Sequence, residues 1–230
     1  MIPLKDDIPS SRFPIVNTGL IIANSLVFLY ELSLGGGAAN LINQLGIVPQ
    51  RIIAGGLGSW GTILSSMFLH GGWVHIVGNM LYLYIFGDNV EDAMGHLRYL
   101  LFYLLCGFAA AWGHILSGPG SIVPTVGASG AIAGVLGAYL VMYPRAGVLT
   151  LIPLGFFIRV VRVPALVVLG FWIVLQLLFG ILSIPLASTA GGGVAWFAHI
   201  GGFVAGAAIA AVSRRRRGAR PPLRPGLILE

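Results

Sequence analysis

Charged side chains are scarce in this sequence. Asp, Glu, Lys and Arg make up 9% of its 230 residues, whereas 57% of the residues are hydrophobic. A soluble domain usually carries about 25% charged residues. The deficit argues against a soluble globular protein and indicates a membrane protein.

Long runs without charge divide the chain into candidate membrane spans. A spanning helix needs roughly 20 apolar residues, and the two longest runs break at Gly-, Pro- and Ser-rich segments, 117–124 and 183–193. The sequence therefore predicts an all-α, polytopic membrane protein with a single membrane domain of six helices. The expected spans lie near 14–34, 62–86, 98–116, 125–143, 164–184 and 194–212.

One further apolar segment, 147–157, is too short to cross a bilayer. Its 11 residues include Pro153 and Gly155, and a helix rises only about 1.5 Å per residue against a hydrocarbon core of about 30 Å. We expect it to form an interfacial hairpin between Arg145 on one side and Arg159 and Arg162 on the other.

The basic residues predict the orientation of the chain. With six spans both termini share one side, and of the 13 Lys and Arg residues all but Arg51 fall on that side. The excess of positive charge predicts cytoplasmic termini. The run Arg214–Arg217 begins a basic tail, 213–230, and directly after an apolar span it favours anionic lipid as a partner over nucleic acid.

Cysteine is almost absent as well. The single cysteine, Cys106, lies in an expected span, so the chain has no intramolecular disulfide. Within the expected spans the polar residues are few, and such residues are functional candidates because they are expensive in a bilayer. The candidates are His70, His75, Asn79, Ser129 and His199.

Three of these candidates share one depth. Counted from the cytoplasmic ends of their helices, Ser129 lies roughly 21 Å, His199 roughly 22 Å and His75 roughly 20 Å from the inner edge at about 1.5 Å per residue. Asn79 lies one turn deeper than His75, on the same helix face. The pattern predicts a polar cluster in the outer half of the bilayer.

Small residues at every fourth position favour close helix packing around this cluster. They are Gly130, Gly134 and Ala138 on one helix, and Ala198, Gly202 and Gly206 on another. We expect Gly127 to allow a tight backbone entry to Ser129, and Gly130 to contact the helix that carries His199. A packing role alone would produce the same spacing, so this pattern does not by itself indicate catalysis.

A serine next to a histidine can perform acyl transfer, because a neutral imidazole takes the hydroxyl proton as the oxygen attacks a carbonyl. The seven acidic residues leave none to support His199, since only Glu31 is expected near the outer side. The sequence thus predicts a Ser129–His199 dyad. The backbone N–H of Ser129 and the side chains of His75 and Asn79 are candidate donors to an oxyanion.

Other chemistries lack their motifs. The chain has no H-E-x-x-H sequence for a zinc protease and no pair of aspartates within its expected spans. The lipase motif G-x-S-x-G fails because Ala131 occupies the position of its second glycine. We expect no metal and no cofactor.

The motifs together resemble those of the rhomboid intramembrane serine proteases of bacterial type. Gly127-Ala-Ser-Gly130 resembles the nucleophile motif, "AHIGGFVAG" (198–206) the histidine helix, and "HGGWVHIVGNM" (70–80) the second helix with its H-x₄-H-x₃-N pattern. The segments 86–107 and 151–172 are also similar to parts of that family. The resemblance covers roughly residues 14–212.

The resemblance implies a six-helix bundle in a bacterial inner membrane, with its active site open to the outer side. It implies Ser129 as nucleophile, His199 as general base and acid, and His75 and Asn79 as oxyanion donors, with Gly127, Gly130, Gly202, Gly206 and His70 in support. The substrates would be single-span membrane proteins. Loop 35–61 would lie partly in the outer leaflet, and the fifth helix and loop 185–193 would move to admit substrate.

One position departs from the family pattern. Some relatives carry a tyrosine four residues after the nucleophile, whereas this chain has Ala133, so the group that orients His199 is open. Two alternatives also stay open: an inactive rhomboid-like protein that binds transmembrane segments, and a small transporter.

Overall fold

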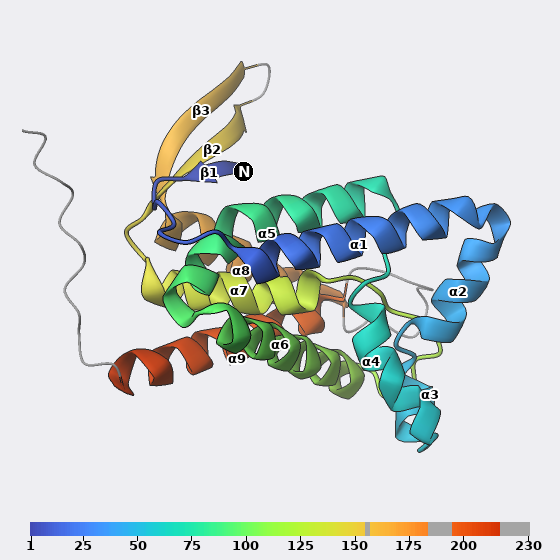
Figure 1. The fold of residues 1–230 in the computed structure, drawn as a ribbon. Coiled ribbons are helices and arrows are strands. Elements are labelled where there is room, and N and C mark those ends of the chain that lie inside the picture. The colour runs from blue at the N-terminus through green and yellow to red at the C-terminus, as the bar shows by residue number, and fades with distance from the viewer. Residues whose placement is uncertain (155–156, 184–194, 217–230) are drawn as a thin grey trace, which may run out of the picture.

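Six long helices form the body of the protein (Figure 1). A computed structural model describes residues 1–154, 157–183 and 195–216. The long helices are α1 (Ile15–Ser33), α5 (Trp73–Met94), α6 (His96–Ser117), α7 (Ser129–Met142), α8 (Ala165–Ser183) and α9 (Trp196–Arg216). The mostly helical class expected from the sequence is confirmed.

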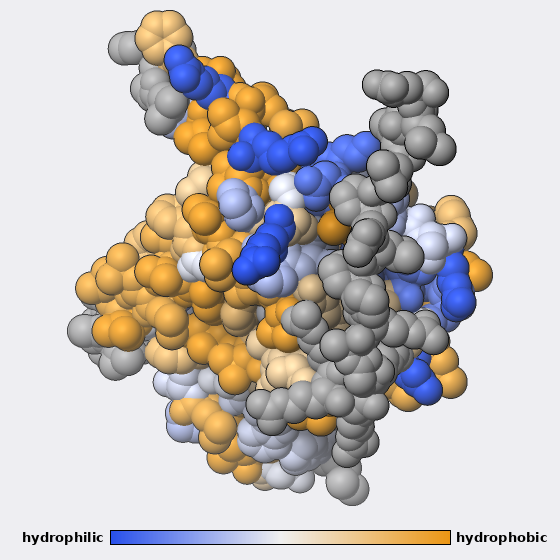
Figure 2. All heavy atoms as spheres, turned by 90° about the vertical axis from the view of Figure 1, so that its left-hand side faces the viewer, coloured by the Kyte–Doolittle hydropathy of each residue, from blue (hydrophilic) through white to orange (hydrophobic). Residues whose placement is uncertain are grey.

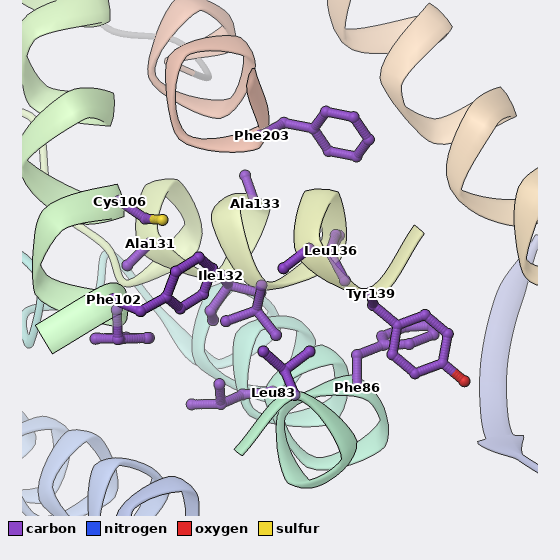
Figure 3. Close-up of a cluster of buried hydrophobic side chains, with 14 of the residues drawn as sticks. Leu83, Phe86, Phe102, Cys106, Ala131, Ile132, Ala133, Leu136, Tyr139 and Phe203 are labelled. Atoms are coloured by element: carbon purple, nitrogen blue, oxygen red, sulfur yellow. The ribbon is translucent and has the colours of Figure 1, made fainter. Parts of the chain in front are cut away.

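Helix α7 is the centre of the bundle. Its residues from Gly130 to Tyr139 are all buried, and the surrounding helices supply the core side chains drawn in Figure 3, among them Phe86 of α5 and Phe102 of α6. A helix that is apolar and covered on all sides belongs to the interior of a bundle. Ser129 is therefore the first residue of the most enclosed helix of the molecule.

The outer helices expose apolar side chains instead. Ile22 and Leu26 of α1 are 53% and 61% exposed, and Val174 and Ile181 of α8 are 58% and 62% exposed. Figure 2 shows hydrophobic side chains over much of the visible face. Apolar patches of this extent suit lipid and not water.

Within the described residues, four helices have the length and hydropathy of a membrane span: Ile15–Ser33, His96–Ser117, Ala165–Ser183 and Trp196–Ser213. Helix α7 is apolar but has only 14 residues, and α5 carries polar residues at both of its ends. The chain is an integral membrane protein, and the count of six spans stays a prediction.

Helix α5 differs from the expected span over 62–86. A separate short helix, α4 (Gly61–Ser66), ends before it, and α5 itself begins at Trp73 and continues to Met94. Gly72 has a φ of 150°, a backbone conformation that side chains rarely adopt. The Gly71-Gly72 pair thus divides the apolar run, which hydropathy alone could not reveal.

The last turns of α5 extend past the apolar stretch, and their acids bind the start of α1 and the residues before it. The buried carboxylate of Glu91 accepts hydrogen bonds from the backbone N–H groups of Val16 and Asn17, at 2.9 and 2.7 Å. Asp92 accepts two more from Ser11. The first N–H groups of a helix have no partner within it, so Glu91 supplies partners at the start of α1 and its charge is favoured by the helix dipole.

The loop after α1 folds into short helical segments at the end of the bundle opposite the sheet (Figure 1). These are the 3₁₀ turn η1 (Gly35–Gly37), α2 (Ala38–Leu45), α3 (Pro49–Ile53) and the 3₁₀ turn η2 (Leu57–Trp60). An isolated bridge between Ile47 and Thr125 ties this loop to the segment that precedes α7.

A three-stranded antiparallel sheet lies at the other end of the bundle, and the sequence did not predict it. Strand β2 (Gly147–Leu154) pairs with β3 (Phe157–Pro164), and β1 (Ile2–Asp6) pairs with β2. The expected hairpin at 147–157 exists, but it extends to residue 164 and recruits the N-terminal strand. Pairing partners more than 140 residues apart leave no local signal in the sequence.

Asp6 attaches this sheet to the helices. Its carboxylate accepts hydrogen bonds from Tyr139 Oη on α7 at 2.5 Å and from Asn89 Nδ2 on α5 at 2.8 Å. Burial raises the pKa of Asp6 to about 6, although the hydrogen bond from Tyr139 lowers it. Because this pKa lies above the unfolded value, the folded state loses stability as the pH rises through the interval up to about 6.

Helices α7 and α9 touch through main-chain atoms. A Cβ atom on Gly202 would overlap the carbonyl oxygen of Gly130, and one on Gly206 would overlap that of Gly134. Gly130 itself makes room for Ala110 of α6, whose Cβ would lie 2.5 Å from a Cβ built on Gly130. Gly130 was expected to contact α9. Its carbonyl group does so, whereas the space left by its missing side chain is filled by Ala110 of α6.

Gly206→Ala should destabilise the bundle by about 1–3 kcal/mol, because the added methyl group forces α9 away from α7. Thermal unfolding in detergent measures the loss. Gly170→Ala is the matched control, since Gly170 lies within α8 with no neighbouring atom within 4 Å of a built Cβ; it should leave stability unchanged or raise it. Equal melting temperatures for both variants would contradict the contact.

The hairpin should lie in the membrane interface, because it exposes apolar side chains next to basic ones. Phe157 and Ile158 are 75% and 68% exposed, and Arg159 and Arg162 follow them. A bimane label on Phe157→Cys in proteoliposomes should be quenched by brominated lipid and shielded from iodide. Leu26→Cys is the lipid-facing reference, and buried Cys106 should stay unlabelled. Full quenching by iodide would place the hairpin in water.

Candidate active site

Ser129 and His199 form a hydrogen bond across the interface of α7 and α9. The distance between Ser129 Oγ and His199 Nε2 is 2.8 Å. His199 is 9% exposed, and its helix touches α7 through Gly202, one turn further along. The fold thus brings together two side chains that are 70 positions apart in the sequence.

The backbone before Ser129 is shaped by Gly127. This residue has a φ of 128°, which favours glycine, and its N–H donates to the carbonyl oxygen of Ser66 at 2.8 Å. The chain then turns so that α7 begins at Ser129. The N–H groups of a helix's first turn lack partners within the helix and attract negative charge.

His75 lies beside this turn. A Cβ atom built on Gly127 would lie 2.6 Å from His75 Nε2 and 3.6 Å from Ser129 Oγ. His75 Nδ1 accepts a hydrogen bond from the Gly71 N–H at 3.3 Å, so the neutral ring carries its proton on Nε2. A donor and the serine hydroxyl therefore border the same small volume, which any side chain on Gly127 would fill.

Asn79 and His70 form a pair of their own. Asn79 Nδ2 lies 3.0 Å from His70 Nε2, both side chains are buried, and the His70 ring packs edge-on against His75 with centroids 5.0 Å apart. The carboxylate of Glu31 accepts a hydrogen bond from the backbone N–H of His70 at 3.1 Å. The structure thus attaches Asn79 to His70, and one proton of its amide group is used there.

Gln176 of α8 is a site residue that the sequence analysis missed. Its Oε1 lies 2.8 Å from His199 Nδ1, and Gln176 is 7% exposed. It is the only amide residue in the apolar run 164–184, and a polar side chain within a span is a functional signal. The sequence does not show which face of α8 is turned toward α9, so it did not predict the contact between Gln176 and His199.

Aromatic rings flank His199 in place of the absent tyrosine. Trp172 of α8 has its ring centroid 5.8 Å from the imidazole at an interplanar angle of 38°, and Trp196 meets the imidazole edge-on at 6.5 Å. Ala133 is fully buried in the core of the bundle. The aromatic neighbours of the imidazole thus come from α8 and α9, and the serine hydroxyl comes from α7.

A cavity of about 40 Å³ borders Ser129. Its polar lining includes Ser66, His114 and Thr125, and His114 Nε2 lies 2.8 Å from Thr125 Oγ1. A water molecule needs roughly 10–15 Å³ of such space and a few polar partners. The cavity therefore has room for water next to the serine.

Two parts of the expected machinery fall outside the described residues: loop 185–193, and the tail from residue 217 onward, together with the side chains of 214–216. Across the described ranges, no group of three or more His, Cys, Asp or Glu residues could hold a metal ion.

Comparison with known proteins gives the family. Residues 57–216 match the model of the Rhomboid domain. The Rhomboid protease GluP of Bacillus subtilis (strain 168) is 38% identical over 125 residues, which are 54% of this chain and 24% of that protein. RHOMBOID-like protein 4 of Arabidopsis thaliana is 34% identical over 173 residues, 75% of this chain and 38% of that protein.

RHOMBOID-like protein 2 of Arabidopsis thaliana is 34% identical over 181 residues, 77% of this chain and 50% of that protein. The matches thus span between about a quarter and a half of these relatives. One is named a protease, whereas the plant proteins are named only rhomboid-like. The domain match covers more than half of the chain and includes Ser129, His199, His75 and Asn79. The chain therefore belongs to the Rhomboid family, which is known for intramembrane serine proteases.

Proposed function

We propose that this protein is an intramembrane serine endopeptidase that cleaves transmembrane segments of other membrane proteins near their outer ends. The observation that carries the proposal is the 2.8 Å hydrogen bond between Ser129 Oγ and His199 Nε2, in a chain of a family known for this chemistry. Nucleophile and base within hydrogen-bond reach are the signature of covalent acyl transfer.

In the first half of the reaction, Ser129 Oγ attacks the scissile carbonyl carbon while His199 Nε2 takes the hydroxyl proton. The tetrahedral intermediate then collapses, the C–N bond breaks, and the imidazolium returns the proton to the leaving amine. In the second half, water attacks the acyl-enzyme with the same assistance. The cavity beside Ser129 offers space for that water.

The negative charge on the oxygen of the intermediate needs donors in place beforehand. The backbone N–H of Ser129 at the start of α7 is one, and His75 Nε2–H is the second, since it borders the same volume as the serine hydroxyl. Asn79 is the third candidate. It has a second amide proton besides the one directed to His70.

The site lies toward the end of the bundle that carries α2, α3 and α4, opposite the sheet (Figure 1). We place that end on the outer side of a bacterial inner membrane and both termini in the cytoplasm. The partners are then single-span membrane proteins, and the basic run Arg214–Arg217 binds anionic lipid. Helix α8 and loop 185–193 are the elements that admit substrate.

Ser129→Ala or His199→Ala should abolish cleavage of a single-span substrate in proteoliposomes, because the nucleophile or its base is lost. A fluorophosphonate probe should label the wild type and not Ser129→Ala. Ser117→Ala, at the exposed end of α6, is the control and should cleave normally. Cleavage by Ser129→Ala would refute the assignment. Absence of cleavage and labelling in the wild type would favour the alternative of an inactive segment-binding protein.

His75→Ala should lower kcat by about 10²-fold with little change in KM, because one oxyanion donor is removed from the transition state. Asn79→Ala should lower it less, since the amide is shared with His70. Steady-state kinetics on the same substrate give both values. Val77→Ala, exposed on the same helix, should behave as wild type. A rise in KM at constant kcat would instead assign His75 to substrate binding.

A further inference from the structure

We propose that Gln176 is a positioning residue for His199, holding the imidazole in the tautomer and orientation that Ser129 requires. This inference rests on the proposed function. It gives the dyad a third member from α8, an amide at the position that a carboxylate occupies in a Ser-His-Asp triad. Gln176 would thus orient His199 in a chain that has Ala133 instead of an aromatic residue.

The two nitrogens of His199 have different partners. Nε2 faces Ser129 Oγ at 2.8 Å, and Nδ1 faces Gln176 Oε1 at 2.8 Å. An amide oxygen can only accept a hydrogen bond, so Nδ1 carries the proton of the neutral ring. Nε2 then presents its lone pair to the serine hydroxyl. This is the tautomer in which His199 can act as the base.

The environment of Gln176 favours a neutral partner. The run 163–183 contains no charged residue, and most of α8 faces outward, with Ala165, Val168, Leu169, Gln176 and Gly180 as its buried residues. An ionised carboxylate buried there would be strongly disfavoured. An amide provides the same acceptor geometry without a buried charge, although it cannot stabilise the imidazolium by charge.

Trp172 restricts the ring from the same helix. It lies four residues before Gln176 and therefore on the same face of α8, with its ring centroid 5.8 Å from the imidazole. One hydrogen bond along the ring plane and one neighbouring aromatic ring together limit rotation of the imidazole. Helix α8 thus orients the imidazole through Gln176 and limits its movement through Trp172.

A packing role for Gln176 is the competing explanation, because amide side chains also join helices in membranes. The two roles predict different results. A packing residue affects stability, and its loss changes kcat and KM only as far as the fold is disturbed. A positioning residue affects kcat in a folded enzyme, and any side chain with an acceptor oxygen at the same place restores activity.

Gln176→Met and Gln176→Glu separate these roles. Methionine is of similar length but offers no comparable acceptor, whereas glutamate keeps an oxygen at that place. We expect Gln176→Met to lower kcat by about 10- to 100-fold with KM within about two-fold of wild type. Labelling by a fluorophosphonate should slow in parallel, and the melting temperature should change little. Gln176→Glu should recover most of kcat, because burial keeps its carboxyl group neutral and the carbonyl oxygen still accepts the hydrogen bond from Nδ1–H.

Leu177→Met is the matched control. It lies next to Gln176, is 43% exposed and should leave both constants unchanged. Wild-type kcat in Gln176→Met would overturn the proposal, as would equal losses of stability and activity in Gln176→Met and Gln176→Glu. Either result would leave the proposed function intact, provided that Ser129→Ala is inactive. A wild type that neither cleaves nor reacts would instead refute the proposed function.

A measurement on the wild type tests the proposal without any variant. Nitrogen-15 NMR of labelled histidine, with His199→Ala to assign the signal, should show His199 as the Nδ1–H tautomer at a pH where the ring is neutral. A dominant Nε2–H tautomer would overturn the proposal, because Gln176 Oε1 could not then be its partner. This test holds even where Gln176→Met fails to fold.

Discussion

The separation of α7 and α9 is set by main-chain atoms, and the Ser129–His199 hydrogen bond depends on it. Gly202 and Gly206 leave no side chain between the helices, so the carbonyl groups of Gly130 and Gly134 reach the surface of α9. A serine side chain is short and cannot span a wider gap. A contact between backbones does not change with side-chain rotamers, so it closely defines the distance between Ser129 and His199.

The other polar residues each lie next to a particular atom of this pair or next to one of its neighbours. His75 borders the volume beside the serine oxygen, Gln176 faces the far nitrogen of the imidazole, and Glu31 and Asn79 hold His70 behind His75. Each of these buried polar side chains has at least one hydrogen-bond partner, as a low-dielectric interior favours, although Nδ1 of His70 has none. The polar residues thus form two hydrogen-bonded groups: Ser129, His199 and Gln176 in one, and Glu31, His70 and Asn79 in the other, with the His75 ring against that of His70.

Much of this arrangement could be predicted from the sequence, because membrane helices convert residue number into depth. The count from Ser129 to Tyr143 and from His199 to Arg214 placed both at one level, and the glycines at every fourth position indicated close packing. Counting residues does not reveal how a helix is rotated about its own axis, so the contact between Gln176 and His199 was missed. The start of α5 was misplaced because hydropathy does not register the break at Gly71 and Gly72.

The pairing of β1 with β2 bears on the order in which the protein is made. Residues 2–6 are synthesised before their partners at 148–151, which follow only after α1, α5, α6 and α7. The hydrogen-bond partners of Asp6, Asn89 and Tyr139, are likewise synthesised after it. Strand β1 therefore remains unpaired until β2 has been synthesised, so the sheet forms through a contact of long sequence separation, which is a slow kind of folding step.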